Sequence, residues 1–434
     1  MPWNVFVIGY EELGKQLLLQ LKHAQDYVFH GLLTLDEVVF ADEYPFDRLV
    51  ADAVAELERF PGAVDAIVGY WDFPTSALAP VLRHRLGLRG PTLEAVLKCE
   101  HKFWSRIEQS RSVPECVPPF QAVDPFATDA VEGIHIDYPF WIKPVTAHSS
   151  HLGFQVDDAG MLREVLPMIK GGIGRFGKPF EQVMARARVP DEIATVTGHY
   201  CVVESIISAG LQCTLEGYVQ NGEVFLTGVV DSVRDRRHPS VLSRYEYPSR
   251  LPESVQQRMF AYTQRFIERI GYDDAPFNIE FYHDPRSGRL WLLEINARLS
   301  RSHAALFHLV DGAPHFQVMV DVALGIAPRM PHRQGRYPVA AKQMIRVFQD
   351  GVVRRVPSTE EIRRVEQTFP GTKVDINVRE GMRLSDLLHQ DSFSYELGAL
   401  FVGAYNRREL RERIIQCRKM LPFDIDPVSI DATA

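Results

Sequence analysis

APFNIEFYHDPRSGRLWLLEINARLSRSH, residues 275–303, has the pattern of two strands joined by a turn. The DPRSG segment contains the residues that tight turns favour, so the stretch is expected to fold back on itself as a hairpin. A turn centred near position 287 places Glu280 opposite Glu294 and places Asn278 opposite Asn296. The sequence therefore predicts a register in which like residues face each other.

Alternation of side chains along a strand separates a polar face from an apolar face. The polar face carries both glutamates, both asparagines and, just beyond the second strand, Arg298. The apolar face carries residues suited to a core: Ile279, Phe281, Leu293 and Ile295. A slip of one residue would exchange the two faces, so this assignment depends on the turn.

Directly opposed carboxylates repel each other, by about 3 kcal/mol at an effective dielectric of 20 if they lie roughly 5 Å apart. A divalent cation between them would reverse the sign of that term. Two glutamates and an asparagine supply oxygen ligands of the kind that Mg²⁺ prefers, which makes Glu280, Glu294 and Asn296 the candidate metal ligands. A solvated polar face with mobile glutamates is the alternative, and the pattern leaves both open.

The composition is that of a globular protein with a substantial core. Of 434 residues, 46% are hydrophobic and 24% are charged, and the formal net charge is −8. That charge balance disfavours nucleic acid and anionic membranes as partners. The chain lacks an apolar run of about 20 residues, and its N-terminus lacks the features of a signal peptide. Five scattered cysteines without a CxxC pair favour free thiols and a cytoplasmic location.

The first 115 residues alternate between strand-like and helix-like segments, which predicts a parallel sheet covered by helices. The expected strands are 3–9, 31–40 and 64–70, and the expected helices are 11–24, 46–60 and 75–86. The turn after the first strand contains Gly9 and Gly14 but no GxGxxG, so dinucleotide binding there is disfavoured.

Four prolines within 114–125 predict a linker. Strand-like runs follow it, with a strong hairpin signal at Asn221-Gly222. Helices are expected near 158–170, 252–270 and 302–325, and a last unit contains expected strands near 341–349, 372–378 and 393–403 before a helix over 406–421. The fold class is thus a mixture of α/β and α+β, with expected domains 1–115, 116–330 and 331–434.

Three further segments contain candidate ligand-binding residues, and none of these signals is specific when taken alone. Lys143 ends an apolar strand before a small polar loop, and Lys102 lies on an expected helix; a solvated lysine is the alternative in both cases. Glu204 and Ile207 lie on or beside a strand that could equally be ordinary core. Arg236 and Arg237 belong to an arginine-rich run that could hold an anion or form a solvated face.

In this order the segments resemble the ATP-grasp superfamily over roughly residues 1–330. The resemblance is sharpest in LLEINARLSRSHAALFHLVDG (292–312), which is similar to the signature of carbamoyl-phosphate synthetase large chains and related ligases. GMRLSDLLHQDSFSYELGALFVGA (381–404) is similar to the C-terminal domain of biotin carboxylases. The resemblance implies an N-terminal Rossmann-like domain, a split ATP-grasp domain with a small subdomain at about 135–205, and a C-terminal α+β domain.

The resemblance also implies ATP and Mg²⁺ as cofactors, with two metal ions expected and Mn²⁺ as an alternative. Lys102 and Lys143 would hold phosphates, and Ser149, Ser150 and Gly153 would belong to the loop that covers them. Glu204 and Ile207 would border the adenine, and Gln212 stands where related proteins commonly have a ribose-binding glutamate. Arg298 would face the transferred phosphoryl group, and Arg236 and Arg237 would hold an anionic substrate.

Departures from the family bear on the reaction. Biotin carboxylases use a glutamate where Ser302 stands and a lysine where Ser240 stands, so a reaction on bicarbonate is disfavoured. The remaining expectation is an enzyme that ligates a small-molecule carboxylate to an amine through an acyl phosphate, with a homodimer left open. The alternatives are a biotin-carboxylase-like enzyme, a non-catalytic ATP-binding regulator suggested by Ser205 and Gln212, and, third, a nicotinamide oxidoreductase.

Overall fold

The structure is a computed structural model that describes residues 2–147, 151–207, 210–238, 241–387 and 393–428. The chain divides into two compact units. The first unit comprises Met1–Val229, Leu251–Arg301 and His315–Met330, and the second comprises Val230–Arg250, Ser302–Pro314 and Pro331–Ala434. The three domain boundaries expected from the sequence remain a prediction.

A three-stranded parallel sheet begins the first unit. Its order is β2 (Tyr27–Leu32), β1 (Trp3–Ile8) and β3 (Ala66–Val68), as the alternating pattern predicted. The strand expected over 31–40 was misplaced, because β2 ends at Leu32 and the helix α2 (Leu35–Val38) follows. The backbone N–H of Thr34 donates to the Glu37 carboxylate at 2.7 Å, and this cap starts the helix.

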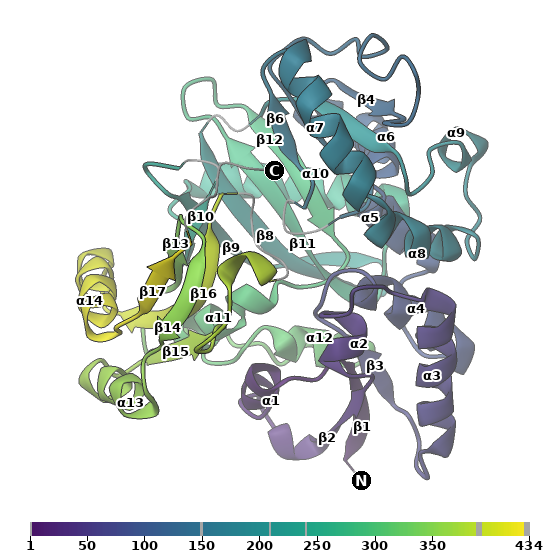
Figure 1. Cartoon of the computed structure of the whole chain (residues 1–434). Coiled ribbons are helices and arrows are strands. Elements are labelled where there is room, and N and C mark those ends of the chain that lie inside the picture. The colour runs from purple at the N-terminus through teal and green to yellow at the C-terminus, as the bar shows by residue number, and fades with distance from the viewer. Residues whose placement is uncertain (1, 148–150, 208–209, 239–240, 388–392, 429–434) are drawn as a thin grey trace. The chain divides into compact units, whose positions relative to one another are not determined.

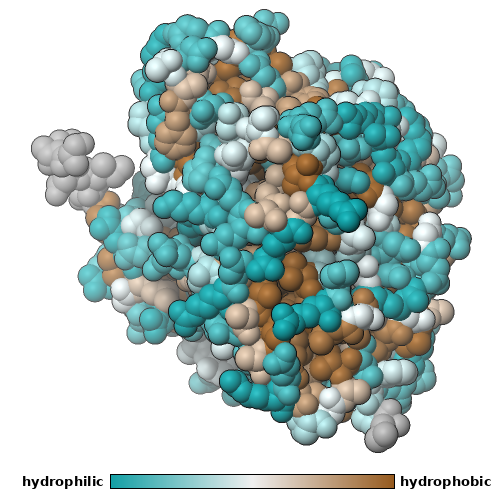
Figure 2. All heavy atoms as spheres, turned by 90° about the vertical axis from the view of Figure 1, so that its right-hand side faces the viewer, coloured by the Kyte–Doolittle hydropathy of each residue, from teal (hydrophilic) through white to brown (hydrophobic). Residues whose placement is uncertain are grey.

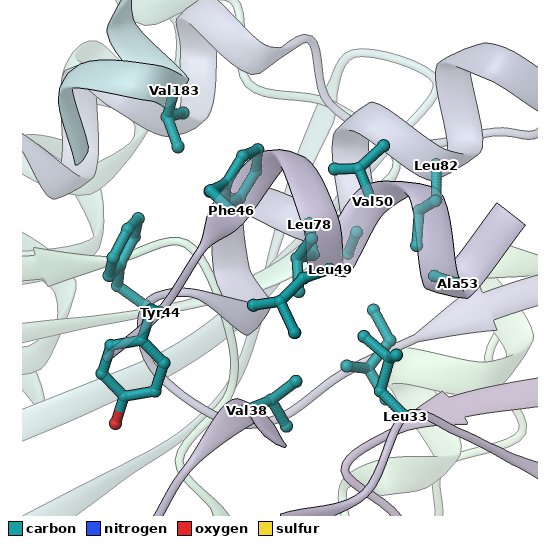
Figure 3. Close-up of a cluster of buried hydrophobic side chains, with 14 of the residues drawn as sticks. Leu33, Val38, Tyr44, Phe46, Leu49, Val50, Ala53, Leu78, Leu82 and Val183 are labelled. Atoms are coloured by element: carbon teal, nitrogen blue, oxygen red, sulfur yellow. The ribbon is translucent and has the colours of Figure 1, made fainter. Parts of the chain in front are cut away.

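Helices cover both faces of this sheet. Figure 1 shows α3 (Phe46–Arg59) and α4 (Thr75–Leu86) on one side and α1 (Glu12–Leu18) and α12 (Phe316–Ala323) on the other. Figure 3 shows how Phe46 and Leu49 of α3 approach Leu78 of α4, with Val183 nearby. Val183 belongs to α8 (Gly174–Met184), so the first core continues beyond the sheet's own helices.

An antiparallel sheet of four strands follows in the order β4 (Phe120–Val123), β7 (Cys201–Ser205), β5 (Phe140–Pro144) and β6 (Phe154–Val156). The helix α7 (Ala159–Gly172) packs against β6. The stretch 114–125, predicted as a linker, contains β4, which pairs with β7. Pro118 and Pro119 precede the strand, so they remove no N–H from its ladder.

The expected hairpins are present in the first unit. Strand β12 (Leu290–Asn296) pairs with β11 (Ala275–His283), which pairs with β8 (Leu211–Gln220), and β8 is followed in the sheet by β9 (Glu223–Arg234). Asn221 and Gly222 join β8 to β9 with φ values of 53° and 78°, as a type I′ turn requires. The helix α10 (Glu253–Ile270) contributes Met259 and Phe266 to the core beneath these strands.

The second unit contains the strands and helices expected near the C-terminus. Its strands are β10 (Leu242–Tyr247), β13 (Val339–Val347), β16 (Tyr395–Ala404), β15 (Thr372–Ile376) and the pair β14 (Gly351–Arg355) and β17 (Asp424–Pro427). Its helices are α11 (Ala304–Asp311), α13 (Thr359–Thr368) and α14 (Arg407–Met420). The helical stretch expected near 302–325 is present but divided into α11 and α12, because Gly312 at φ 96° ends α11.

Short elements complete the described chain: α9 (Asp191–Ala194), η1 (Ala24–Asp26), η2 (Pro114–Cys116), η3 (Arg301–His303) and η4 (Leu384–Asp386). All five cysteines are buried free thiols.

Figure 2 shows a face on which hydrophilic residues alternate with apolar ones that gather toward its lower part. Among the helices of the described ranges, none combines the length and the apolar character that crossing a bilayer requires.

Candidate active site

The two glutamates of the hairpin face each other as predicted. Glu280 of β11 pairs with Glu294 of β12, and Asn278 pairs with Asn296. A bulge follows Glu280, so that Phe281 pairs with Leu292. The expected core position of Leu293 was therefore wrong: Leu292 is the fully buried residue, and Leu293 is partly exposed. The inserted residue shifts the alternation by one position on the far side of the bulge.

Lys102 lies directly against this pair of carboxylates. It is the first residue of α6 (Lys102–Ser112), which follows α5 (Leu93–Glu100) after a single residue. Its Nζ is 3.0 Å from Glu294 Oε1 and donates to the Ala147 carbonyl at 2.6 Å. Burial opposes the charged form of this lysine, but the carboxylates of Glu294, Glu100 and Asp72 together outweigh burial and raise the pKa of Lys102.

Lys143 of β5 is held by a second buried carboxylate. Its Nζ is 3.2 Å from Glu204 Oε1, and the terminal nitrogen of Arg106 is 2.7 Å from Glu204 Oε2. Burial favours the neutral acid, but the two cations outweigh it, so the pKa of Glu204 falls to about 2. Arg106 also donates to the carbonyls of Leu292 at 2.7 Å and Leu293 at 3.0 Å. One guanidinium thus joins α6, β7 and β12.

These ion pairs close the site. The residues around them enclose a cavity of about 10 Å³: Cys99, Lys102, Ser105, Arg106, Gln109, Lys143, Glu204, Leu293, Glu294 and Ile295. That volume is about one water molecule. Both lysines are therefore already paired with carboxylates of the chain itself. An anionic ligand that binds these lysines would have to displace those carboxylates.

The three candidate metal ligands lie side by side on adjacent strands. Gln212 Nε2 of β8 donates to Glu280 Oε2 at 2.7 Å, and Asn296 Nδ2 donates to Asn278 Oδ1 at 2.9 Å. Within the described residues, no group of three or more His, Cys, Asp or Glu side chains could hold a metal ion. Two glutamates and an asparagine amide oxygen nevertheless form a hard oxygen donor set, which fits Mg²⁺ together with ligand phosphates.

Arg298 extends the site toward the carboxyl edge of the parallel sheet. Its Nε donates to Asp72 Oδ1 at 2.8 Å, and a terminal nitrogen contacts the same oxygen. Asp72 lies in the loop after β3, where ligands commonly bind in open α/β sheets. The Asn278 amide holds the Arg298 carbonyl at 2.9 Å, so the arginine is anchored from both the backbone and the side chain.

The remaining predicted residues are distributed as follows. Gly153 and Ile207 are buried residues of the first unit. Arg236 and Arg237 are exposed residues of the second unit, just beyond β9. Ser149 and Ser150, together with Ser240, lie outside the described residues. Their roles stay predictions.

Three residues of the cluster were not predicted from the sequence. Arg106 follows Lys102 by four positions, so both share one helix face, and that spacing was the available signal. Asp72 follows a buried parallel strand, the position at which functional side chains gather. Glu100 precedes Lys102 by two residues at the end of α5, and the sequence carried no separate signal for it.

The segment around the hairpin is similar to a known family of ATP-binding domains. Residues 219–329 match the family "Carbamoyl-phosphate synthase L chain, ATP binding domain". The carbamoyl phosphate synthase large chain, C-terminal section, of Methanopyrus kandleri is 24% identical over 199 residues, which cover 42% of this chain and 36% of that protein. The chain thus spans about a third of the length of that relative.

Solved structures resemble the chain over nearly its whole length. The L-amino acid ligase from Bacillus licheniformis matches with a TM-score of 0.70 at 17% identity, covering 97% of this chain and 98% of that one. The biotin carboxylase domain of the Hydrogenobacter thermophilus 2-oxoglutarate carboxylase matches with a TM-score of 0.63 at 14% identity, covering 98% and 92%. These likenesses confirm the expected fold class, and the match over residues 219–329 confirms the resemblance to carbamoyl-phosphate synthetase large chains.

Proposed function

We propose that the protein is an ATP-dependent ligase that joins a carboxylate to an amine through an acyl phosphate and releases ADP and phosphate. The observation that carries this proposal is the in-register pair of Glu280 and Glu294, with Lys102 bound to Glu294 at 3.0 Å. Carboxylates and ammonium groups so close together suit a magnesium nucleotide, whose phosphates are anionic and whose metal is cationic.

The nucleotide would exchange partners with the ion pairs of the closed site. Lys102 and Lys143 would release Glu294 and Glu204 and bind phosphate oxygens. The freed Glu294, together with Glu280 and Asn296, would hold Mg²⁺, and a second ion or Mn²⁺ is compatible with the same donors. When bound, the metal would supply charge neutralisation between the terminal phosphates.

The family pattern supplies the residues that would border the adenine and those that would form the loop over the phosphates. Ile207 and the backbone beside Glu204 would border the adenine, because the Glu204 side chain is already engaged by Arg106. Gly153, with Ser149 and Ser150, would close over the phosphates and exclude water, which would otherwise hydrolyse an acyl phosphate. Gln212 contacts Glu280, so we assign it to the metal side of the nucleotide rather than to the ribose alone.

Substrate carboxylate would attack the γ-phosphorus while Arg298 faces the transferred phosphoryl group. The amine would then attack the acyl carbon, and phosphate would leave. Arg236 and Arg237 would hold the anionic substrate. Alignment and charge neutralisation supply most of the catalysis in such phosphoryl transfers. The L-amino acid ligase that shares the fold supports amino acids as the first substrates to test.

Release of ADP from mixtures of amino-acid pairs, with mass spectrometry of the product, tests the proposal. We expect amide formation that depends on Mg²⁺, on ATP and on both amino acids. ADP release that requires bicarbonate and biotin would instead support the biotin-carboxylase-like alternative. Ser302 argues against that alternative, since its hydroxyl accepts from Lys342 at 3.0 Å and it offers no carboxylate base. Nucleotide binding without turnover on any pair would favour the regulatory alternative.

We further propose that the enzyme acts in the cytoplasm, as its five buried free thiols suit a reducing compartment. A homodimer is compatible with this proposal, and neither nucleic acid nor membrane is proposed as a partner.

A further inference from the structure

Asn278 is a buried polar residue in the middle of the face that carries the candidate metal ligands. It belongs to β11, and only 1% of its surface is exposed. In the register of the sheet it lies between Asn296 of β12 and Glu216 of β8. Burying an amide costs free energy unless its polar groups are hydrogen-bonded. The partners of this amide therefore show what the residue does.

Both ends of the Asn278 amide are engaged. Its Nδ2 donates to the Arg298 carbonyl at 2.9 Å, and its Oδ1 accepts from Asn296 Nδ2 at 2.9 Å. An asparagine amide has the same shape in either orientation, so the direction in which it points follows from its partners. A peptide carbonyl can only accept a hydrogen bond. Asn278 must therefore turn its NH₂ group to Arg298 and its oxygen to Asn296.

The orientation of Asn278 also decides that of Asn296. Two amide oxygens cannot hydrogen-bond each other, so Asn296 must present its NH₂ group to the Asn278 oxygen. The oxygen of the planar Asn296 amide then points away from Asn278. Because Asn296 is partly exposed, a ligand can reach this oxygen. Mg²⁺ binds amide oxygens and not NH₂ groups, so the chain of contacts selects the end of Asn296 that a metal needs.

The carbonyl at which this chain begins is held in place on both sides. The Arg298 side chain donates to Asp72 at 2.8 Å. Two residues further on, the backbone N–H of Ser300 donates to Glu216 at 3.2 Å, and Glu216 is itself 1% exposed. The backbone between these anchors presents a fixed acceptor to Asn278. The same segment carries the arginine that would face the phosphoryl group.

We propose that Asn278 is a positioning residue that turns the Asn296 oxygen toward the nucleotide-bound Mg²⁺ and ties it to the segment that carries Arg298. The assignment rests on the proposed ligase function and adds a residue to its metal site. Without Asn278, the Asn296 NH₂ group would be free to donate to the carboxylates of Glu280 or Glu294 on the same face. It would then occupy the oxygens that Mg²⁺ should bind. Residues that orient a metal ligand commonly contribute about 10- to 100-fold to metal affinity.

Nucleotide binding without turnover tests the assignment. The β,γ-imido analogue of ATP, which is not hydrolysed, is titrated by calorimetry once with Mg²⁺ and once with EDTA. We expect Asn278→Ala to weaken binding with Mg²⁺ by roughly 10- to 100-fold and to leave binding in EDTA unchanged, because the phosphate-binding lysines are untouched. Asn4→Ala on β1 is the matched control. It removes an asparagine whose Oδ1 lies 3.0 Å from His30 Nε2, and both titrations should stay as in the wild type.

A double-mutant cycle shows whether Asn278 acts through Asn296. Asn296→Ala removes the metal ligand itself, so no amide remains to be oriented. In that background Asn278→Ala should weaken binding with Mg²⁺ no further. Losses that add in the double variant would overturn the assignment, because Asn278 would then act independently of Asn296.

Asn278→Asp separates positioning from packing and also serves if Asn278→Ala fails to fold. A carboxylate still accepts from Asn296 Nδ2, and its charge attracts Mg²⁺. We therefore expect Asn278→Asp to bind the analogue with Mg²⁺ nearly as the wild type does. A purely structural role predicts the opposite order, with Asn278→Asp more damaged than Asn278→Ala, since a buried charge costs more than a lost amide. That order would contradict the assignment.

The remaining outcomes distinguish the two proposals. If Asn278→Ala binds the analogue with Mg²⁺ as the wild type does, or is weakened equally with Mg²⁺ and in EDTA, the positioning role is wrong while the ligase proposal stands. If the wild-type protein binds the analogue no more tightly with Mg²⁺ than in EDTA, the metal site of the ligase proposal fails and the role of Asn278 falls with it.

Discussion

The carboxylate of Glu204 lies between two cations, 2.7 Å from a terminal nitrogen of Arg106 and 3.2 Å from Lys143 Nζ. Replacing Arg106 by methionine would leave this buried charge with one partner and would strip a donor from the Leu292 carbonyl. We expect a loss of about 3–5 kcal/mol in the free energy of unfolding, measured by urea denaturation. Arg111→Met on the same helix removes an exposed pair with Glu192 and a pair with Glu108, which keeps Arg269 as its partner, and should cost about 1 kcal/mol or less.

The same carboxylate predicts a pH dependence of stability. Its folded pKa of about 2 lies below the unfolded value of 4.5, so its stabilisation is complete above that value and is lost as the pH falls toward 2. Glu204→Gln should therefore lower the urea midpoint more at pH 7 than at pH 3. An equal loss at both values would show that the ionised carboxylate is not the stabilising group.

Glu294→Gln should impair the metal site while it preserves side-chain volume. Loss of one charged ligand should raise the Mg²⁺ concentration needed for half-maximal ADP release at least about 10-fold. Titrating Mg²⁺ at saturating ATP gives the measurement. Glu253→Gln, in the first turn of α10, makes the same chemical change away from the site and should leave the titration unchanged. Full activity of Glu294→Gln at low Mg²⁺ would remove the metal assignment.

Asp72→Asn tests the contact that orients Arg298. Arg298 would lose the charge that orients it, and a misplacement of about 1 Å can cost 10²-fold in turnover. The loss is measured as kcat for ADP release at saturating substrates. Wild-type turnover in Asp72→Asn would contradict the orienting role of this contact.

Replacing a glycine by alanine should have opposite effects in the hairpin turn and in a helix. Gly222 has φ of 78° with no other atom within 4 Å of an added Cβ, so Gly222→Ala should cost about 1–2 kcal/mol through backbone conformation alone. Gly171 of α7 also has open space around it, and Gly171→Ala should stabilise by up to about 1 kcal/mol. Thermal unfolding of both variants checks the opposite signs. Equal effects would mean that the turn at Asn221-Gly222 differs from type I′.

Local sequence was enough to predict the hairpins, because a turn and the alternation of side chains act between neighbours in the chain. The pairing of Glu280 with Glu294 follows from the DPRSG turn, and Asn221-Gly222 encodes its own positive φ values. The bulge after Glu280 was missed, since nothing in the alternation of the strand marks one inserted residue. The division of the helical stretch near 302–325 was missed for a comparable reason, as Gly312 alone ends α11.

The sequence by itself determined which elements form, which faces of them are polar, and the resemblance to the ATP-grasp superfamily. Only the tertiary structure decided which charges meet. Asp72 and Arg298 are 226 residues apart, and Arg106 is 98 residues from Glu204. Propensity and periodicity act over a few residues, whereas the partner of a buried charge depends on how whole layers pack, so the ion pairs of the site could be read only from the folded chain.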